Sequence, residues 1–247
     1  MELGMVGLGR MGGNMVQRLL NRGHRVVAFD LSQDAVKALV AKGAVGATSW
    51  ADFVAKLESR PRVMWVMVPA GDPTTQSIDQ LISLADKGDI IIDGGNTNWK
   101  VAMQDCERIK AKGMHYMDAG TSGGVWGLEY GYCLMVGAEP EIYDHCMPLL
   151  KDLAPDEGGL VRTGPEGSGH FVKMVHNGVE YGLMQAYAEG FQVMKLSRAF
   201  PEMDMHAIAE AWRTGSVVRS WLLDLIARGL TEDPELSTIK GYVEDTG

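Results

Sequence analysis

Short apolar runs alternate with amphipathic segments along the first two-thirds of the chain. The runs have the length of strands, and the segments between them repeat their apolar residues at helical spacing. Strands that alternate with helices form βαβ units around a parallel sheet. The expected strands are Glu2–Leu8, Arg25–Phe29, Val63–Val68, Ile90–Asp93 and Met114–Asp118, and the expected helices are about Met11–Asn21, Ser32–Ala41, Trp50–Leu57, Pro73–Ala85 and Thr97–Lys112.

The pattern changes after "RTGPEGSG", which runs from Arg162 to Gly169. Before it, the runs Cys133–Gly137 and Leu160–Thr163 flank a helical pattern at Glu141–Leu150 and are expected to extend the sheet. After it the pattern is helical alone, and the sequence predicts a boundary near Gly164. We therefore expect an α/β fold, a Rossmann-type mostly parallel sheet followed by an all-α C-terminal domain. The expected later helices are about His170–Leu196, Asp204–Arg213 and Val218–Arg228.

Composition and charge narrow the class of protein. The 247 residues are 46% hydrophobic and 22% charged, which is typical of globular domains. The net charge of -9 argues against a general nucleic-acid binder, although a locally basic pocket remains compatible with a small anionic substrate. The chain begins without a positively charged leader, and its apolar runs are too short to span a bilayer. Cys106, Cys133 and Cys146 are widely spaced, which indicates reduced thiols and a cytoplasmic protein.

The segment "VGLGRMGGN" carries the first candidate chemistry. Gly7, Gly9 and Gly12 form a G-x-G-x-x-G pattern that follows a strand and opens a helix. In that context, the glycines permit a tight turn, close approach of a pyrophosphate and close packing of helix on strand. The alternative is a glycine-rich turn without a ligand. The free N–H groups at the helix start favour the first interpretation, a dinucleotide site.

The second strand is followed by Asp30, where an acid is expected to bind a ribose hydroxyl. A carboxylate repels a 2′-phosphate, so we expect NAD as the cofactor, with NADP possible because Arg10 is near enough in sequence to meet a 2′-phosphate. The alternative role of Asp30 is to cap the next helix, for which Ser32 is already available.

Three loops follow expected strands and share one edge of the sheet. They are "MVPAGDP" after Val66, "DGGNTN" from Asp93 and "DAGTSGGVWG" from Asp118. Ligands bind beyond the carboxyl ends of parallel strands, and glycine pairs beside Asn96 and Ser122 let backbone N–H groups approach a ligand. Turn chemistry alone explains any one of these loops. All three together at a dinucleotide fold indicate a site.

The segment "GHFVKMVHNGVEYG" places polar side chains on one face of a helix. Lys173, Asn177 and Glu180 are spaced i, i+4, i+7, and Lys173 and Glu180 are about 10 Å apart along the axis. Side chains of this length can converge on a small substrate. The alternative is a solvated polar stripe, which is common on surface helices. Gly178 and Gly182 weaken that alternative, because each costs about 1 kcal/mol in a helix interior.

The three segments "GHFVKMVHNGVEYG", "DAGTSGGVWGLEYG" and "VGLGRMGGN" together resemble the decarboxylating 6-phosphogluconate dehydrogenases over essentially the whole chain. The run K-M-V-H-N-G-x-E-Y is the specific part, because the broader β-hydroxyacid dehydrogenases usually lack H-N-G-x-E-Y. The acid at Asp30 and the short length resemble the NAD-leaning branch. The resemblance implies oxidation of 6-phosphogluconate to ribulose 5-phosphate and CO2 in the pentose phosphate pathway. It also implies that residues 1–164 bind the dinucleotide and that 165–247 serve substrate binding and dimerisation.

The resemblance assigns roles to individual residues. Lys173 is implied to be the general base, and Glu180 is implied to donate the proton that completes the product. No metal is implied. The implied substrate-binding residues are Asn96, Ser122, Gly123, Gly124, His176, Asn177 and Tyr181, and the expected cofactor-binding residues are Gly7, Leu8, Gly9, Arg10, Met11, Gly12, Asp30, Val68, Pro69, Ala70 and Asn96.

Two other functions remain open at this stage. A related β-hydroxyacid dehydrogenase would share Lys173 and Asn177 but act on a small acid without a phosphate. An NAD-binding regulatory protein would bind cofactor without turnover. The family also places more basic residues around the substrate phosphate, and near the end of this chain only Lys240 is basic. A helical domain of about eighty residues is small for an independent core, so we expect a homodimer or a higher homo-oligomer.

Overall fold

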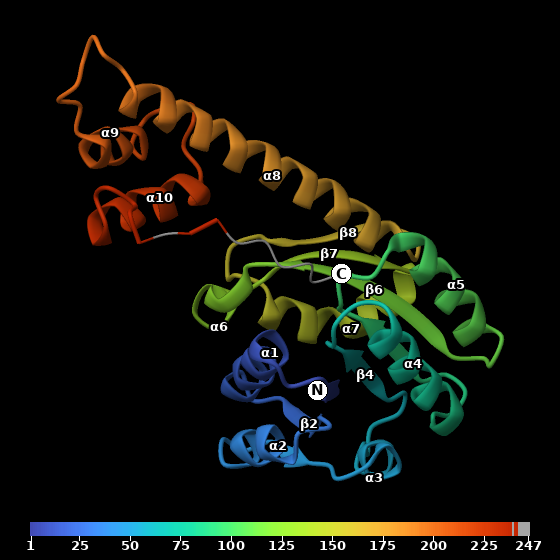
Figure 1. Cartoon of the computed structure of the whole chain (residues 1–247). Helices are drawn as coiled ribbons and strands as arrows, with labels where there is room; N and C mark the ends of the chain where they lie inside the picture. The colour runs from blue at the N-terminus through green and yellow to red at the C-terminus, as the bar shows by residue number, and fades with distance from the viewer. Residues whose placement is uncertain (239, 242–247) are drawn as a thin grey trace. The chain divides into compact units, whose positions relative to one another are not determined.

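The computed structural model describes residues 1–238, 240 and 241. Its strands form a single sheet. They are β1 (Glu2–Val6), β2 (Arg25–Phe29), β3 (Val45–Gly46), β4 (Val63–Val66), β5 (Ile90–Asp93), β6 (His115–Ser122), β7 (Cys133–Ala138) and β8 (Leu160–Gly164). Their order is β3-β2-β1-β4-β5-β6-β7-β8, and each pair is parallel except β6 with β7 (Figure 1). The predicted Rossmann-type, mostly parallel sheet is confirmed.

Helices cover both faces of this sheet. Alternate residues of one strand enter opposite cores, as Trp65 and Met64 of β4 show, so the central strands are apolar throughout. The first core receives α1 (Arg10–Asn21), α2 (Gln33–Val40) and α7 (Pro140–Leu153), and the second receives α3 (Trp50–Ala55), α4 (Asp72–Leu84) and α5 (Trp99–Lys110).

Local signals begin several of these helices where the sequence indicates. Ser32 and Ser49 cap α2 and α3 by accepting hydrogen bonds from backbone N–H groups three residues later. Asn98 caps α5 in a similar way, and Pro73 lies in the first turn of α4. These capping bonds fix where each strand-to-helix loop ends, and those loops form the edge of the sheet that carries the candidate site.

The structure differs from the expected elements mainly after Met114. The strand expected to end at Asp118 continues as β6 to Ser122, because its last residues pair with the antiparallel strand β7. The short helices η1 (Gly124–Trp126) and α6 (Gly127–Tyr130) follow within a segment expected to be a loop. The two-residue strand β3 was also missed, because two residues carry no recognisable period.

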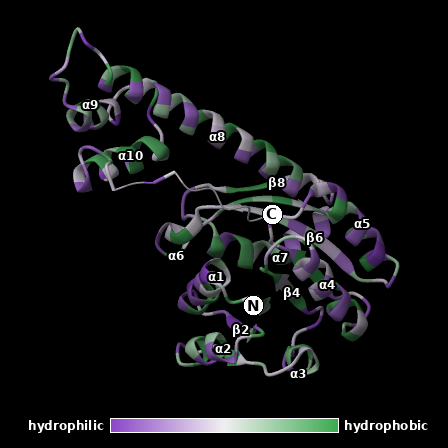
Figure 2. Cartoon of the chain, in the orientation of Figure 1, coloured by the Kyte–Doolittle hydropathy of each residue, from purple (hydrophilic) through white to green (hydrophobic). Residues whose placement is uncertain are grey.

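The chain divides into two units, one of Met1–Met174 and one that begins at Val175. The second unit contains most of α8 (Ser168–Lys195) with α9 (Met205–Trp212) and α10 (Trp221–Glu232), and it is helical as predicted. Its buried core is small and consists of Ala209, Ala227 and Leu230, with Phe191 packed against them. Figure 2 shows the hydrophobic residues of α10. No helix in the described part of the chain has the length and apolar character needed to cross a membrane.

Candidate active site

The glycine-rich loop between β1 and α1 is shaped by two close backbone contacts. Gly7 has a φ of +90°, and an added Cβ would collide with the carbonyl oxygen of Met67. A Cβ at Gly12 would collide with the carbonyl oxygen of Gly7, so α1 packs directly on the loop. Gly9 faces open space, with no described atom within 4 Å of an added Cβ. This is the arrangement that lets a pyrophosphate approach the start of α1.

Asp30 joins this loop to the end of β2. Its Oδ2 accepts a hydrogen bond from Leu8 N over 2.7 Å, and its Oδ1 accepts one from Ser32 N over 2.7 Å. Ser32 caps α2 with its own hydroxyl, so Asp30 is not needed as the cap. A carboxylate oxygen can accept more than one hydrogen bond, and Asp30 therefore retains capacity for a ribose hydroxyl.

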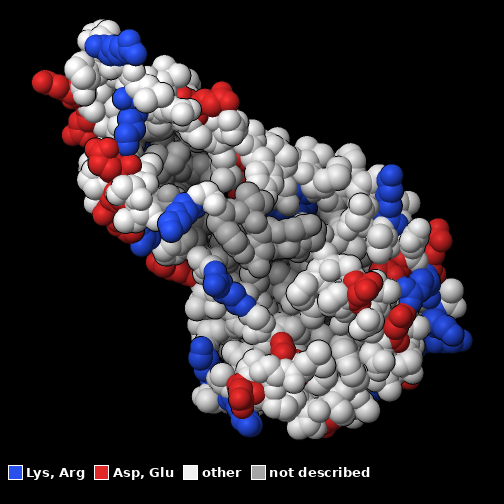
Figure 3. Space-filling model, viewed as in Figure 1, with Lys and Arg blue, Asp and Glu red and all other residues white. Residues whose placement is uncertain are grey.

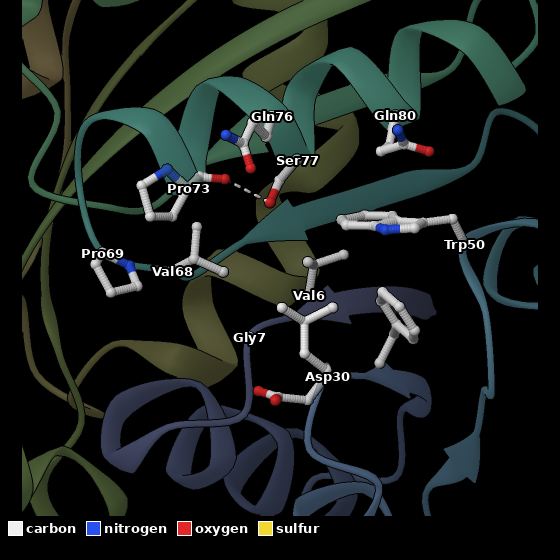
Figure 4. Close-up of a pocket in the computed structure, with 12 residues that line it drawn as sticks. Val6, Gly7, Asp30, Trp50, Val68, Pro69, Pro73, Gln76, Ser77 and Gln80 are labelled. Carbon is white, nitrogen blue, oxygen red and sulfur yellow. Dashed lines mark hydrogen bonds between the residues drawn. The ribbon is translucent and has the colours of Figure 1, made fainter.

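A cavity of about 670 Å³ opens beside Asp30 at the carboxyl ends of β1, β2 and β4. Figure 4 shows Asp30 at one side of it and Gln76 and Gln80 of α4 at the other. Trp50 forms a further wall, with its ring 4.7 Å from that of Phe29. The cavity has the size and the mixed apolar and polar lining expected of a cofactor's adenosine half.

Trp50, Gln76 and Gln80 were not predicted as site residues, since none lies in a recognisable motif. Gln76 and Gln80 have only a positional signal in the sequence, because they follow the strand predicted at Val63–Val68, whereas Trp50 follows β3, which was not predicted. Among the predicted residues, Gly7, Asp30, Val68 and Pro69 line this cavity. Leu8 is buried, whereas Gly9 and Arg10 are exposed at the start of α1; the remaining cofactor candidates Met11 and Ala70 are half-buried.

The loop after β5 is held close to the sheet. A Cβ at Gly94 would collide with the indole nitrogen of Trp65, which is fully buried, so only glycine fits at this position. Gly95 N donates to Asp93 Oδ1 over 3.0 Å and turns the chain towards Asn96, which is exposed. The conformation of the loop therefore brings Asn96 to the surface at the carboxyl edge.

Lys173 packs against the backbone of β6. A Cβ added at Gly120 would lie 2.5 Å from Cβ of Lys173 and 2.8 Å from the carbonyl oxygen of Gly169. Ser122 ends the same strand two residues later, and the half-buried Gly123 and exposed Gly124 continue from it. The structure thus brings Lys173 next to the strand that leads into the predicted Ser122–Gly124 loop.

Three buried titratable residues lie near the start of α8 and were not predicted as site residues from the sequence. His170 Nε2 is 3.4 Å from Asp93 Oδ2, and the two side chains are 1% and 0% exposed. Asp118 accepts hydrogen bonds from Gly167 N over 2.6 Å and from His170 N over 2.7 Å. Burial opposes the charge on His170, but Asp93 and Asp118 together hold its pKa above the ordinary value. Asp93 and Asp118 are visible in the sequence only as the first residues of two loops.

The remaining candidates lie in the second unit, on α8. His176 Nδ1 is 3.4 Å from Asn177 Oδ1 and 3.8 Å from Glu180 Oε2. Tyr181 is 69% exposed. The apolar neighbours Val175 and Val179 are 48% and 58% exposed, so this part of the helix is open on its apolar sides as well. Gly178 and Gly182 face open space, as a close approach by another group requires.

Charge and metal-binding groups add two observations. On the face seen in Figure 3, basic and acidic side chains are interspersed rather than gathered into a basic patch. Within the residues that the structure describes, no group of three or more His, Cys, Asp or Glu side chains is arranged to hold a metal ion.

Comparison with known families identifies the family of this chain. The model described as the NAD binding domain of 6-phosphogluconate dehydrogenase matches residues 2–163, and the model of the 6-phosphogluconate dehydrogenase C-terminal domain matches residues 169–239. This chain belongs to the 6-phosphogluconate dehydrogenase family. The two matched segments together include the glycine loop, the three strand-end loops and the polar stripe of α8.

Individual relatives agree with this assignment. The NAD(+)-dependent, decarboxylating 6-phosphogluconate dehydrogenase of Haloferax volcanii is 45% identical over 94% of this chain and 76% of its own length. A relative from Bacillus subtilis that bears the same family name is 43% identical over 100% of this chain and 82% of its own length. The solved 6-phosphogluconate dehydrogenase of Plasmodium falciparum has a TM-score of 0.86 and 28% identity, covering 96% of this chain and 52% of that one.

Proposed function

We propose that this chain catalyses the oxidative decarboxylation of 6-phosphogluconate to ribulose 5-phosphate and CO2, with reduction of NAD. The observation that supports this most directly is the position of Lys173. It packs on Gly120 of β6, two residues before Ser122 and beside the loop expected to bind substrate. A dinucleotide fold brings the reacting end of the cofactor to this same edge of the sheet.

The cofactor site supports NAD over NADP. The open space above Gly9, the start of α1 and the 670 Å³ cavity together fit a dinucleotide. When bound, NAD accepts a hydride from the substrate. Asp30 accepts a ribose hydroxyl in this arrangement, and its negative charge disfavours a 2′-phosphate. Arg10 is exposed beside the loop and offers the only cationic group of the predicted cofactor set, so NADP remains the weaker cofactor in this proposal.

Lys173 acts as the general base. It takes the proton from the hydroxyl on C3 of the substrate while the hydride leaves that carbon, which produces a ketone β to the carboxylate. The carboxylate then leaves as CO2, and its bonding electrons move into the ketone to give an enediol. Protonated Lys173 stabilises the developing negative charge on that oxygen.

Glu180 completes the reaction by donating a proton to the carbon that lost CO2, which becomes C1 of ribulose 5-phosphate. Lys173, which gave its proton to the enediol oxygen, takes that proton back as the ketone forms. On α8, His176 lies close to both Asn177 and Glu180. We assign His176 and Asn177 to orient the substrate. Tyr181, Asn96, Ser122, Gly123 and Gly124 complete the proposed substrate-binding set.

We divide the proposed functions between the two segments that match the family models. We assign dinucleotide binding to residues 1–164, and substrate binding and dimerisation to residues 165–247. A homodimer or higher homo-oligomer is supported by the small core of the helical unit and by Val193 and Leu196, which are 72% and 70% exposed. A native mass spectrum with monomer alone at micromolar concentration would contradict this.

The three cysteines are free thiols in the structure, and we assign the protein to the cytoplasm.

The activity is tested by following reduced cofactor at 340 nm with 6-phosphogluconate and NAD while CO2 is trapped in parallel. Equal amounts of both products support the proposal. Reduced cofactor without CO2 would instead indicate a simple hydroxyacid dehydrogenase, and cofactor binding without reduction would indicate a non-catalytic protein.

A further inference from the structure

A buried ionic cluster lies beneath the start of α8 and has no part in the proposed chemistry. It consists of Asp93 at the end of β5, Asp118 in β6 and His170 in the first turn of α8. All three residues are at most 2% exposed. Burying two carboxylates is costly unless the charges are compensated, so an arrangement of this kind requires a physical reason.

The cluster connects the two loops of the site with the helix that carries Lys173. Asp93 opens the loop that leads to Asn96, and its Oδ1 accepts the hydrogen bond that shapes that loop. Asp118 accepts two backbone hydrogen bonds from the start of α8. Gly169 allows this close approach, since a Cβ there would collide with the carbonyl oxygen of Met135 and would lie 2.8 Å from that of Asp118.

The ring of His170 faces Asp93, and the backbone N–H of the same residue binds Asp118. Its Nε2 is 3.4 Å from Asp93, although neither ring nitrogen has a well-aligned hydrogen-bond partner among the described residues. Burial opposes the carboxylate of Asp93, but His170 outweighs it and holds the pKa of Asp93 below its ordinary value. The hydroxyl of Tyr116 also lies against Asp93, 3.4 Å from Oδ2, and hydrogen bonds from Thr97 and Gly95 help to lower the pKa of Asp93. The charge of Asp93 in turn helps to raise the pKa of Asp105. At Asp118, burial outweighs the effect of His170 and raises the pKa, so the charge of His170 acts chiefly on Asp93.

We propose that His170, as an imidazolium whose ring lies against Asp93 and whose backbone N–H binds Asp118, is a positioning residue that fixes Lys173 against β6 and in register with the Asn96 loop. His170 and Lys173 are three residues apart on α8 and lie on neighbouring positions of one helix face. Loss of the cation at His170 leaves Asp93 and Asp118 to repel each other, which loosens the first turn of α8. This inference rests on the proposed function, because Lys173 is the base of that reaction.

The test compares His170→Gln with a matched control, His24→Gln. His24 is also buried and pairs with an acid, Asp152, over 2.6 Å, but it lies before β2 at the opposite edge of the sheet. Both variants are expected to lose thermal stability. His170→Gln alone is expected to lose kcat by about 10- to 100-fold, the range typical of a small displacement of a catalytic group, with little change in NAD affinity. Equal kcat losses in the two variants would overturn the proposal.

A second readout does not depend on turnover. The rate of reductive methylation of Lys173, mapped by mass spectrometry, is expected to change by about fivefold or more in His170→Gln and by less than about twofold in His24→Gln. If the wild-type protein fails to oxidise 6-phosphogluconate, the proposed function is wrong, but a selective change at Lys173 would still support the positioning role. An unchanged labelling rate in His170→Gln would overturn it.

A third measurement covers the case in which His170→Gln does not fold. Histidine-labelled wild-type protein is titrated by NMR, and the His170 resonance is assigned from its absence in spectra of a His170→Asn sample or from through-space contacts to Tyr116. The proposal requires a charged ring at pH 7.5. A neutral ring at that pH would overturn it, since a neutral imidazole carries no charge to offset the buried carboxylate of Asp93.

Discussion

The backbone N–H of Leu8 donates a hydrogen bond to Oδ2 of Asp30 over 2.7 Å, which joins the glycine-rich loop to the end of β2. The same carboxylate also borders the cavity assigned to the cofactor. Asp30 therefore has two functions in this account. It fixes the conformation of the glycine-rich loop, and it is proposed to determine which ribose can bind.

Replacing Asp30 by Asn tests both functions. The side chain keeps its size and one acceptor, but it loses the charge that disfavours a 2′-phosphate. We expect kcat/KM for NAD to fall by about 10- to 100-fold, equivalent to a hydrogen bond to a charged group, and the preference for NAD over NADP to shrink. The control is Asp34→Asn, because the side chain of Asp34 is 91% exposed. This variant should leave kcat/KM unchanged for NAD and for NADP. A wild-type enzyme that already prefers NADP would refute the role of Asp30.

Replacing Gly120 by Ala tests the packing of Lys173 on β6. The new Cβ would lie 2.5 Å from Cβ of Lys173, so α8 must shift at its first turn. We expect kcat to fall by about 100-fold, while the Kd for NAD stays within about twofold, because the glycine loop is not touched. Steady-state kinetics and cofactor titration measure the two effects.

Gly190→Ala is the matched control for that variant. Gly190 also lies in α8 but faces open space, and alanine is the better helix former by about 1 kcal/mol. This control should raise the melting temperature and preserve kcat. Full activity in Gly120→Ala would mean that the catalytic role of Lys173 does not depend on its packing against β6.

Asp105 makes stability depend on pH. Burial, with the charge of Asp93 adding to the effect, raises the pKa of Asp105 from 3.8 to about 6. A group whose folded pKa is raised stabilises the protein below its unfolded pKa, and this contribution is lost as the pH rises through the folded value. The free energy of unfolding should therefore gain about 1–3 kcal/mol at pH 7 in Asp105→Asn, with the contact to Arg108 reducing the gain.

Urea denaturation at pH 4 and at pH 7 measures this gain. The difference in stability between Asp105→Asn and wild type should be largely lost at the lower pH, which lies well below the folded pKa and close to the unfolded value of 3.8. The control is Glu107→Gln, which alters an exposed carboxyl on the same helix as Asp105. A variant that is less stable than wild type at pH 7 would show that the ion pair with Arg108 outweighs burial.

Trp50 is expected to contribute to cofactor affinity. Its ring forms a wall of the cavity and contacts Phe29 at 4.7 Å between centroids. Trp50→Ala should raise the KM for NAD by about 5- to 20-fold with kcat nearly unchanged, whereas Trp50→Phe should retain most of the affinity. Equal affinities in wild type and Trp50→Ala would exclude the ring from the cofactor site.

The fold was predictable where its local signals are strong. The period of the apolar residues placed β2 and β5 at the residues where the structure has them, and the glycine pattern identified the loop before α1. The extension of β6 to Ser122 was not predictable, because it depends on antiparallel pairing with β7, a contact that no local period encodes. β3 is too short to show a period at all.

The candidate site was predictable only in its motifs. Lys173 and the Ser122 loop stand out because glycines and polar residues interrupt apolar patterns. Trp50 and His170 do not stand out, since a tryptophan at a helix start and a histidine in an amphipathic helix have ordinary structural explanations. Their importance depends on which strands they meet, and only the tertiary structure shows that His170 lies between two buried acids.

The most direct test of the central claim uses 6-phosphogluconate labelled with ¹³C at C1, incubated with NAD and the wild-type protein in ²H₂O and followed by NMR. The label is expected to leave as ¹³CO2, and ribulose 5-phosphate is expected to carry one deuterium at C1, delivered by Glu180. Retention of the label in an oxidised acid would contradict the central claim, because Lys173 would then serve a dehydrogenase without decarboxylation.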